Sequence, residues 1–208
     1  MKRSHFVVTC LLAASALSSG CALTTDRIQI QYQQQQGVRK VDGAGEVSVA
    51  VAVNDRRQDK SKVGSKKNGF GMEMAPILAA EDVSVTIQRA IAQEVQARGF
   101  KLGAETSMVQ VSAEVTRFYN DHKMGFFAGD AVADLNLAVV VQARDGKILY
   151  SRQISVQGIE PNTQLATGEN ARLALNRSLE NGMKVLFEDQ AFLSALLAPK
   201  PRAGANPA

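Results

Sequence analysis

The order of sequence patterns predicts an α+β fold: a mixed, mainly antiparallel sheet (order β-α-β-β-β-α) with two main helices packed on one face. Three observations lead to it. An alternating valine strand precedes an amphipathic helix, three strand patterns follow closely, and a long helical pattern ends the domain. Because short turns join antiparallel neighbours, whereas strands separated by a helix can run parallel, we expect a mixed sheet.

The first strand and the first helix have the clearest periodicities. Residues 47–53 place valine at every second position, which is typical of a strand that buries one face. Residues 84–98 place apolar side chains three and four positions apart, the spacing of an amphipathic helix. Asp82 stands at the expected N-cap, and Gly99 follows the helix, where a left-handed residue commonly ends one.

Three strand patterns lie between the two helices. Residues 108–118 alternate apolar and polar side chains, and residues 120–129 indicate a loop. Residues 131–143 predict a longer apolar strand, and the Asp-Gly dipeptide at 145–146 is a strong hairpin signal. Residues 148–158 are the expected partner strand of that hairpin.

The C-terminal pattern predicts one long and one short helix. A loop at 160–167 contains Pro161 and precedes a helix over 169–188, for which Asn170 is a candidate cap. A shorter helical segment is expected at 191–197.

Two polar segments are expected to lack regular structure for most of their length. Residues 24–45 indicate a tether with one short strand over 28–32 and a solvated glutamine spacer at 33–36. Residues 55–71 are polar, basic and interrupted by glycines, which predicts a long loop.

The N terminus has the three-part build of a secretory signal. Lys2 and Arg3 precede a mostly apolar run at 6–17, and small residues lead directly into Cys21. This arrangement resembles the lipobox of bacterial lipoproteins, although Ser18 stands where the commonest form has leucine. The resemblance implies that the Cys21 thiol takes a diacylglyceryl group, that the signal is removed and that the new amino terminus is acylated, typically with palmitate.

The lipobox also divides the chain and implies a location. We expect a lipoprotein signal peptide (1–20), a lipidated N terminus and tether (21–45), a single α+β domain (46–198) and a disordered tail (199–208). Ala22 follows the cysteine, whereas an aspartate there favours retention in the inner membrane of enterobacteria. The resemblance therefore implies an outer-membrane protein that faces the periplasm.

Composition narrows the classes of function. The 208 residues carry a formal net charge of +4, and loss of Lys2 and Arg3 leaves the mature chain at +2, which does not favour nucleic-acid binding. With Cys10 discarded and Cys21 acylated, no disulfide forms. His122 is the one histidine of the mature chain, and in its predicted loop it is expected to be solvated. We therefore expect no enzyme, no metal site and no cofactor.

Two surface features remain as candidate contacts. The predicted long loop carries a set of basic residues: Arg56, Arg57, Lys60, Lys62, Lys66 and Lys67. These cations suit an anionic envelope surface, and the alternative is a solvated loop with no partner. Phe126 and Phe127 are adjacent in the predicted 120–129 loop, where they either contact a partner or fold back into the core.

The chain resembles the YajG-type lipoprotein family over residues 46–190. The residues that carry the resemblance are the lipobox cysteine, the strand end Val51-Ala-Val-Asn-Asp-Arg-Arg57, the helix end Ala97-Arg-Gly-Phe100, Tyr150 with the strand that ends near Gly158, and Asn170, Ala171, Leu175, Asn176 and Leu179. The resemblance implies a lipoprotein of unassigned activity and supplies no catalytic residues. Each motif also has a structural interpretation, such as a clamp of Asp55 and Arg57 at the strand end.

The leading functional hypothesis is a non-enzymatic lipoprotein that binds an envelope protein partner or supports envelope organisation. The alternative is an accessory lipoprotein subunit of an envelope transport system, since such subunits have similar size and mixed α+β domains. The sequence leaves the oligomeric state open.

Overall fold

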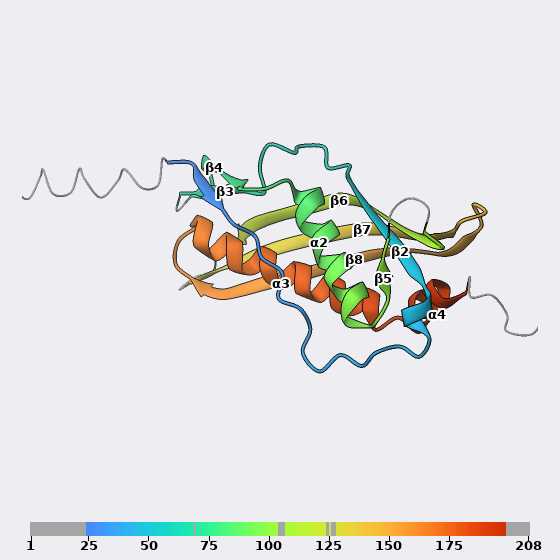
Figure 1. Ribbon diagram of the computed structural model, residues 1–208. Coiled ribbons are helices and arrows are strands. Elements are labelled where there is room, and N and C mark those ends of the chain that lie inside the picture. The colour runs from blue at the N-terminus through green and yellow to red at the C-terminus, as the bar shows by residue number, and fades with distance from the viewer. Residues whose placement is uncertain (1–23, 69, 104–106, 124, 126–127, 199–208) are drawn as a thin grey trace, which may run out of the picture.

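Eight strands form one mixed sheet in this computed structural model, and the long helices pack on one face of it (Figure 1). The structure describes residues 24–68, 70–103, 107–123, 125 and 128–198. The strands are β1 (Asp26–Ile28), β2 (Ser48–Asp55), β3 (Gly64–Lys67), β4 (Glu73–Ala79), β5 (Lys101–Leu102), β6 (Val109–Lys123), β7 (Gly129–Ala143) and β8 (Ile148–Thr163). The helices are α2 (Val83–Ala97), α3 (Gly168–Phe187) and α4 (Gln190–Leu197), with a short 3₁₀ turn at Ala44–Glu46.

Strand β6 organises the sheet. Its first half pairs in parallel with β2, its second half meets β3, and its whole length pairs antiparallel with β7. Strand β8 pairs antiparallel with β7, and within the described residues no strand pairs with its other side, so β8 is a sheet edge there. The predicted α+β class and the parallel relation of the two strands that flank α2 are confirmed.

Burial explains the strand and helix patterns. The valines of β2, β6 and β7 meet the apolar sides of α2 and α3 in one core, which burial stabilises by about 25 cal/mol per Å² of apolar surface. Gly158 in β8 lets α3 lie directly on the sheet, because an added Cβ would stand 2.2 Å from the Ala174 carbonyl oxygen. Gly99 and Gly146 adopt the left-handed φ that their predicted helix end and hairpin turn require.

Three predicted loops were wrong in part. Strand β3 falls inside the predicted 55–71 loop, because Gly64–Lys67 lacks a strand pattern and is held by its neighbours β4 and β6. Strand β6 continues to Lys123, within the predicted 120–129 loop. Strand β8 runs on to Thr163 despite Pro161, which an edge strand tolerates because it needs no inner N–H there.

The helix caps also differ from prediction. Asp82 does occupy the N-cap of α2, but its side chain makes no capping hydrogen bond. Thr167, rather than Asn170, caps α3: its Oγ1 accepts from the Asn170 N–H at 3.3 Å. The backbone path decides the cap, because Thr167 has the extended N-cap conformation whereas Asn170 already lies within the helix.

The expected tether lies against the folded domain. Strand β1 pairs in parallel with β4, and the chain then crosses α3 and α2 (Figure 1). The Gln31 N–H donates to Asn176 Oδ1 at 3.0 Å, and the Gln35 N–H donates to Glu94 Oε1 at 3.0 Å. The predicted solvated spacer is therefore wrong at Gln35, which a buried carboxylate holds in place. No helix in the described part of the chain has both the length and the apolarity to cross a bilayer.

Candidate functional site

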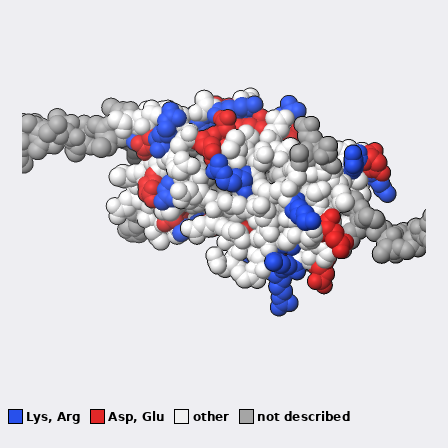
Figure 2. Space-filling view, in the orientation of Figure 1, with Lys and Arg blue, Asp and Glu red and all other residues white. Residues whose placement is uncertain are grey.

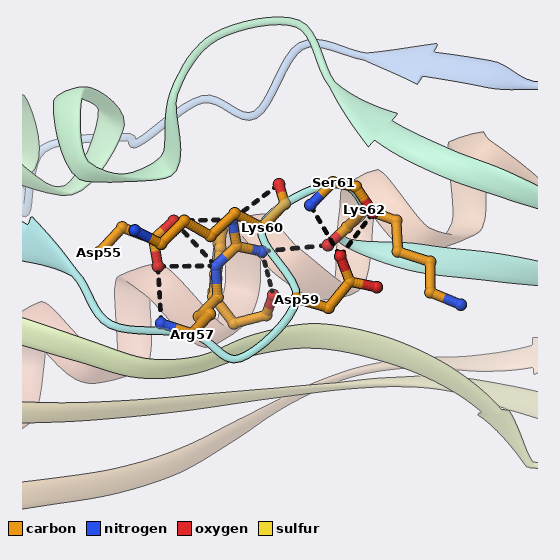
Figure 3. Close-up of polar contacts among 7 residues, drawn as sticks. Asp55, Arg57, Asp59, Lys60, Ser61 and Lys62 are labelled. Atoms are coloured by element: carbon orange, nitrogen blue, oxygen red, sulfur yellow. Dashed lines mark hydrogen bonds and ion pairs between the residues drawn. The ribbon is translucent and has the colours of Figure 1, made fainter.

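A buried arginine lies at the centre of the predicted basic segment (Figure 3). Arg57 follows the end of β2 and is only 7% exposed. Its Nη2 donates to Asp55 Oδ2 at 2.9 Å, and its Nη1 donates to the carbonyl oxygens of Lys62 and Phe118 at 3.1 and 3.3 Å. The guanidinium therefore ties three segments together: the β2 end, the chain that leads into β3, and the middle of β6.

The partner carboxylate stays ionised. Burial of Asp55 opposes its charge, but hydrogen bonds from the Arg57 side chain and N–H outweigh it and hold the pKa of Asp55 below its usual range. The expected clamp between Asp55 and Arg57 is confirmed. Its geometry is that of a structural junction, because the Arg57 guanidinium donates its hydrogen bonds to acceptors of this chain.

The other predicted cations do not all lie in one solvated loop: Arg56, Lys60 and Lys62 lie between β2 and β3, whereas Lys66 and Lys67 lie in β3. Four of them form ion pairs: Lys62 with Glu73 of β4 at 2.8 Å, Lys66 with Asp26 of β1 at 2.8 Å, Lys67 with Asp121 of β6, and Arg56 with Glu114 of β6 at 3.3 Å. Lys60 is exposed beside the clamp. Lys66 is 7% exposed, so its ammonium serves mainly to hold β1 against β3.

A polar cavity of about 390 Å³ opens at the carboxyl end of β2. The Asp55–Arg57 pair, Arg27 and Lys60 contribute to its wall, together with the residues that begin α2. Charges of both signs alternate there with small apolar side chains. This mixed lining does not favour one class of ligand over another.

His122 lies in the sheet and not in a solvated loop, so that prediction was wrong. It is 5% exposed in β6, and its Nδ1 lies 3.3 Å from Thr163 Oγ1 in β8. Burial lowers the pKa of His122, because the imidazolium would lose its hydration. The neutral ring links the C-terminal ends of β6 and β8, which lie on either side of the start of β7.

A second buried charge cluster was missed by sequence reasoning. Glu94 is fully buried in α2 and pairs with Arg98 one turn later. Tyr32 donates its hydroxyl to Glu94 Oε1 at 2.5 Å, and burial raises the pKa of Tyr32 above its usual range. The Glu-to-Arg spacing of four residues was the available signal, but the same spacing is common on solvated helix faces. The cluster holds the N-terminal segment on α2.

The edge strand β8 is covered over one part and open over another. Helix α3 reaches its outward carbonyls: Arg177 Nη1 donates to Ile159, and Asn181 Nδ2 donates to Gln157 at 2.7 Å. Residues in an antiparallel ladder alternate between facing the partner strand and facing away. Since the register is regular from Tyr150 to Glu160, residues 151, 153 and 155 also direct their backbone groups outward, and no described residue bonds to those groups.

Three predicted site residues lie outside the described residues: Cys21, Phe126 and Phe127. Thr24, three residues after Cys21, has its hydroxyl 3.4 Å from Lys66 Nζ. Among the residues that the structure describes, no three Cys, His, Asp or Glu side chains gather as a metal site would require.

A family model described as "Uncharacterized lipoprotein" matches residues 29–196. The chain belongs to this uncharacterised lipoprotein family. The match spans every strand from β2 to β8 and both long helices, so membership covers the folded domain. A search of curated proteins finds no match to the chain.

Solved structures extend the likeness at the level of the fold. The protein XCC0632 of Xanthomonas campestris superposes with a TM-score of 0.56 at 13% identity, over 83% of this chain and 98% of that one. Lipoprotein GNA1162 of Neisseria meningitidis gives 0.38 at 12% identity, over 56% and 86%. A minor lipoprotein of Acinetobacter baumannii gives 0.37 at 6% identity, over 66% and 89%. The first of these likenesses shows a shared fold.

Proposed function

We propose that this member of the uncharacterised lipoprotein family is of the YajG type, is anchored to the outer membrane through acylated Cys21, and faces the periplasm. Its work is to bind an envelope protein rather than to catalyse a reaction. Family membership and the lipobox support the anchor. Ala22 after the cysteine supports the outer membrane.

The open stretch of strand β8 carries the binding role. Residues 151, 153 and 155 direct N–H and C=O groups away from β7, and their side chains are uncharged and exposed. An extended segment of a partner gains main-chain hydrogen bonds by adding to such an edge. Natural edges are usually blunted by charge or covered, and here Arg177 and Asn181 cover only the neighbouring carbonyls.

The groups available for chemistry support a non-enzymatic role. Acylation of Cys21 leaves the mature chain without a free thiol. His122 is buried, and its Nδ1 faces Thr163. Steady hydrolysis of peptidoglycan or an ester by the purified chain, abolished by a single substitution, would contradict this part of the proposal.

Photocrosslinking from Gln153 in intact cells tests the binding edge, with Val85 on α2 as a matched exposed control. We expect a discrete adduct with another envelope protein from Gln153 alone. Ser155→Pro removes one outward N–H and should abolish that adduct, whereas Ser155→Ala should retain it. No adduct, the same adducts from both positions, or an adduct with a second copy would contradict the proposal.

The sorting proposal has its own test. Ala22→Asp should move the protein from outer-membrane to inner-membrane fractions on a density gradient, without changing its acylation. If the wild-type protein already sediments with the inner membrane, the outer-membrane assignment is wrong.

A further inference from the structure

We propose that one end of the sheet is a membrane-docking surface that enters the bilayer holding the lipid anchor. The docking surface consists of Phe70, Met72, Met74 and Leu165. The proposal rests on the proposed function, because it requires Cys21 to be acylated. Its partner is the glycerophospholipid interface, and its site lies away from the β8 edge residues and the polar cavity.

The direction of the N-terminal chain places the anchor at this end. Strand β1 pairs in parallel with β4, with Asp26 opposite Ile77. The described residues before Asp26, 25 and 24, therefore run toward the start of β4 and so toward Met72. Cys21 is five residues before Asp26 and, at about 3.5 Å per extended residue, lies within roughly 17 Å of it. The lysine that binds Asp26, Lys66, is itself on β3, next to the tip.

Hydrogen bonds to Asn68 hold the turn between β3 and β4, and this turn exposes large apolar side chains. Asn68 Oδ1 accepts from the N–H groups of Phe70 and Met72, each at 3.0 Å, and the Asn68 N–H donates to the Met72 carbonyl. The Phe70 side chain is 91% exposed, Met72 59% and Met74 39%. An ordered turn that displays three large apolar side chains is unfavourable in water and favourable at a lipid interface.

The loop before α3 adds to the same end. Leu165 is 69% exposed. Three residues later, the Gly168 N–H donates to Asp26 Oδ2 at 2.9 Å, and Asp26 in turn binds Lys66. Leu165 is thus tied through short links to the strand that leads to the anchor.

Charges at this end suit a headgroup layer. Lys123 ends β6 here and is exposed, and the nearby Lys67 pairs with Asp121. Figure 2 shows uncharged surface interspersed with a few charges of both signs at the left, where β1, β3 and β4 lie in Figure 1. A peripheral membrane contact typically places apolar side chains in the lipid interface and lysines beside them, near the headgroups. The position of the anchor selects lipid over a protein partner for this surface.

Depth measurements on the acylated full-length protein test the proposal. The mature chain offers no thiol besides Cys21, so Phe70→Cys, Leu165→Cys and the control Ile148→Cys each take one spin label. Ile148 is 63% exposed and lies beside the turn at the opposite end of the sheet. The proteins are placed in vesicles of phosphatidylethanolamine and phosphatidylglycerol. Collisions with oxygen, which concentrates in the bilayer, and with a water-soluble nickel chelate are then compared.

We expect labels at positions 70 and 165 to collide several-fold more with oxygen, and several-fold less with nickel, than the label at 148. Met72→Ser with Met74→Ser should reduce oxygen access at position 165 while leaving the circular dichroism melt unchanged. Equal nickel access at all three positions would overturn the docking surface. If the protein floats with vesicles in that case, the anchor stands and docking alone fails. If it does not float, both proposals fall.

Discussion

Two hairpin tips at opposite ends of the sheet have similar backbones and opposite side chains. The β3–β4 turn is closed by Asn68 and displays Phe70 and Met72. The β7–β8 turn is closed by the Ala143 N–H to the Lys147 carbonyl and displays exposed charged residues, with Lys147 N–H bonded to Asp145. Both turns are tight, so the difference is not one of folding geometry.

The polarity of each turn correlates with its distance from the lipid anchor. A charged tip is what water requires of an exposed turn, and the far tip conforms to it. The apolar tip lies beside the strand that leads to Cys21. We infer that the two ends meet different solvents, and the following changes break or sharpen that contrast.

Replacing the anchor has the largest expected effect. Cys21→Ser removes the acyl chains, each methylene of which contributes about 0.8 kcal/mol to membrane binding. The protein should move from the membrane to the soluble fraction, as measured by immunoblotting after ultracentrifugation. Unchanged membrane fractionation would show that Cys21 is not the anchor and would remove the basis of the contrast between the ends.

Removing the buried arginine should destabilise β3 and β4, the strands at the end of the sheet nearer the lipid anchor. Arg57→Ala leaves the Asp55 carboxylate without its partner, and breaking a buried pair typically costs about 3–5 kcal/mol of unfolding free energy. Urea unfolding measures this loss, and hydrogen exchange should rise first in β3 and β4. The control is Arg56→Ala, whose pair with Glu114 is half exposed and contributes under about 1 kcal/mol. Equal losses in both variants would contradict the role of the clamp.

Acid should lower the unfolding free energy through His122, which lies at the end of the sheet nearer the lipid anchor. Its folded pKa lies below the ordinary histidine value of about 6.5, so the unfolded chain binds the proton first as pH falls. Above that pH the ring is neutral in both states and has no effect. Below it, stability decreases until the folded pKa is reached. His122→Gln should flatten this part of the pH–stability curve, and an identical curve would contradict the assignment.

The smallest effect is expected at the tip itself. Phe70→Ser is a change at an almost fully exposed side chain, and such changes usually alter the unfolding free energy by no more than about 0.5 kcal/mol. A much larger loss in urea unfolding would mean that Phe70 supports the fold, and the contrast between the tips would then be structural.

Periodicity predicted the parts of the fold in which each residue's environment repeats. The valines of β2 and the apolar stripe of α2 were sufficient, because a half-buried strand and a half-buried helix each leave a pattern in sequence. Strand β3 left none, since Gly64–Lys67 is held by pairing with β4 and β6. The burial of Arg57 in its loop and of His122 in β6 leaves no local pattern for the same reason: burial of a polar residue depends on a distant partner.

The sequence by itself determined the order of the main elements, the Asp-Gly turn, the lipobox with Cys21 and the set of residues that can do chemistry. These are local properties, fixed by side-chain period, backbone conformation and short motifs. Only the tertiary structure decided that four cations of the basic segment pair with carboxylates of β1, β4 and β6, that the residues after Thr24 join the fold, and that Phe70 and Leu165 share one end. Each of these depends on contacts between segments far apart in the chain, and no local pattern encodes which distant segments meet.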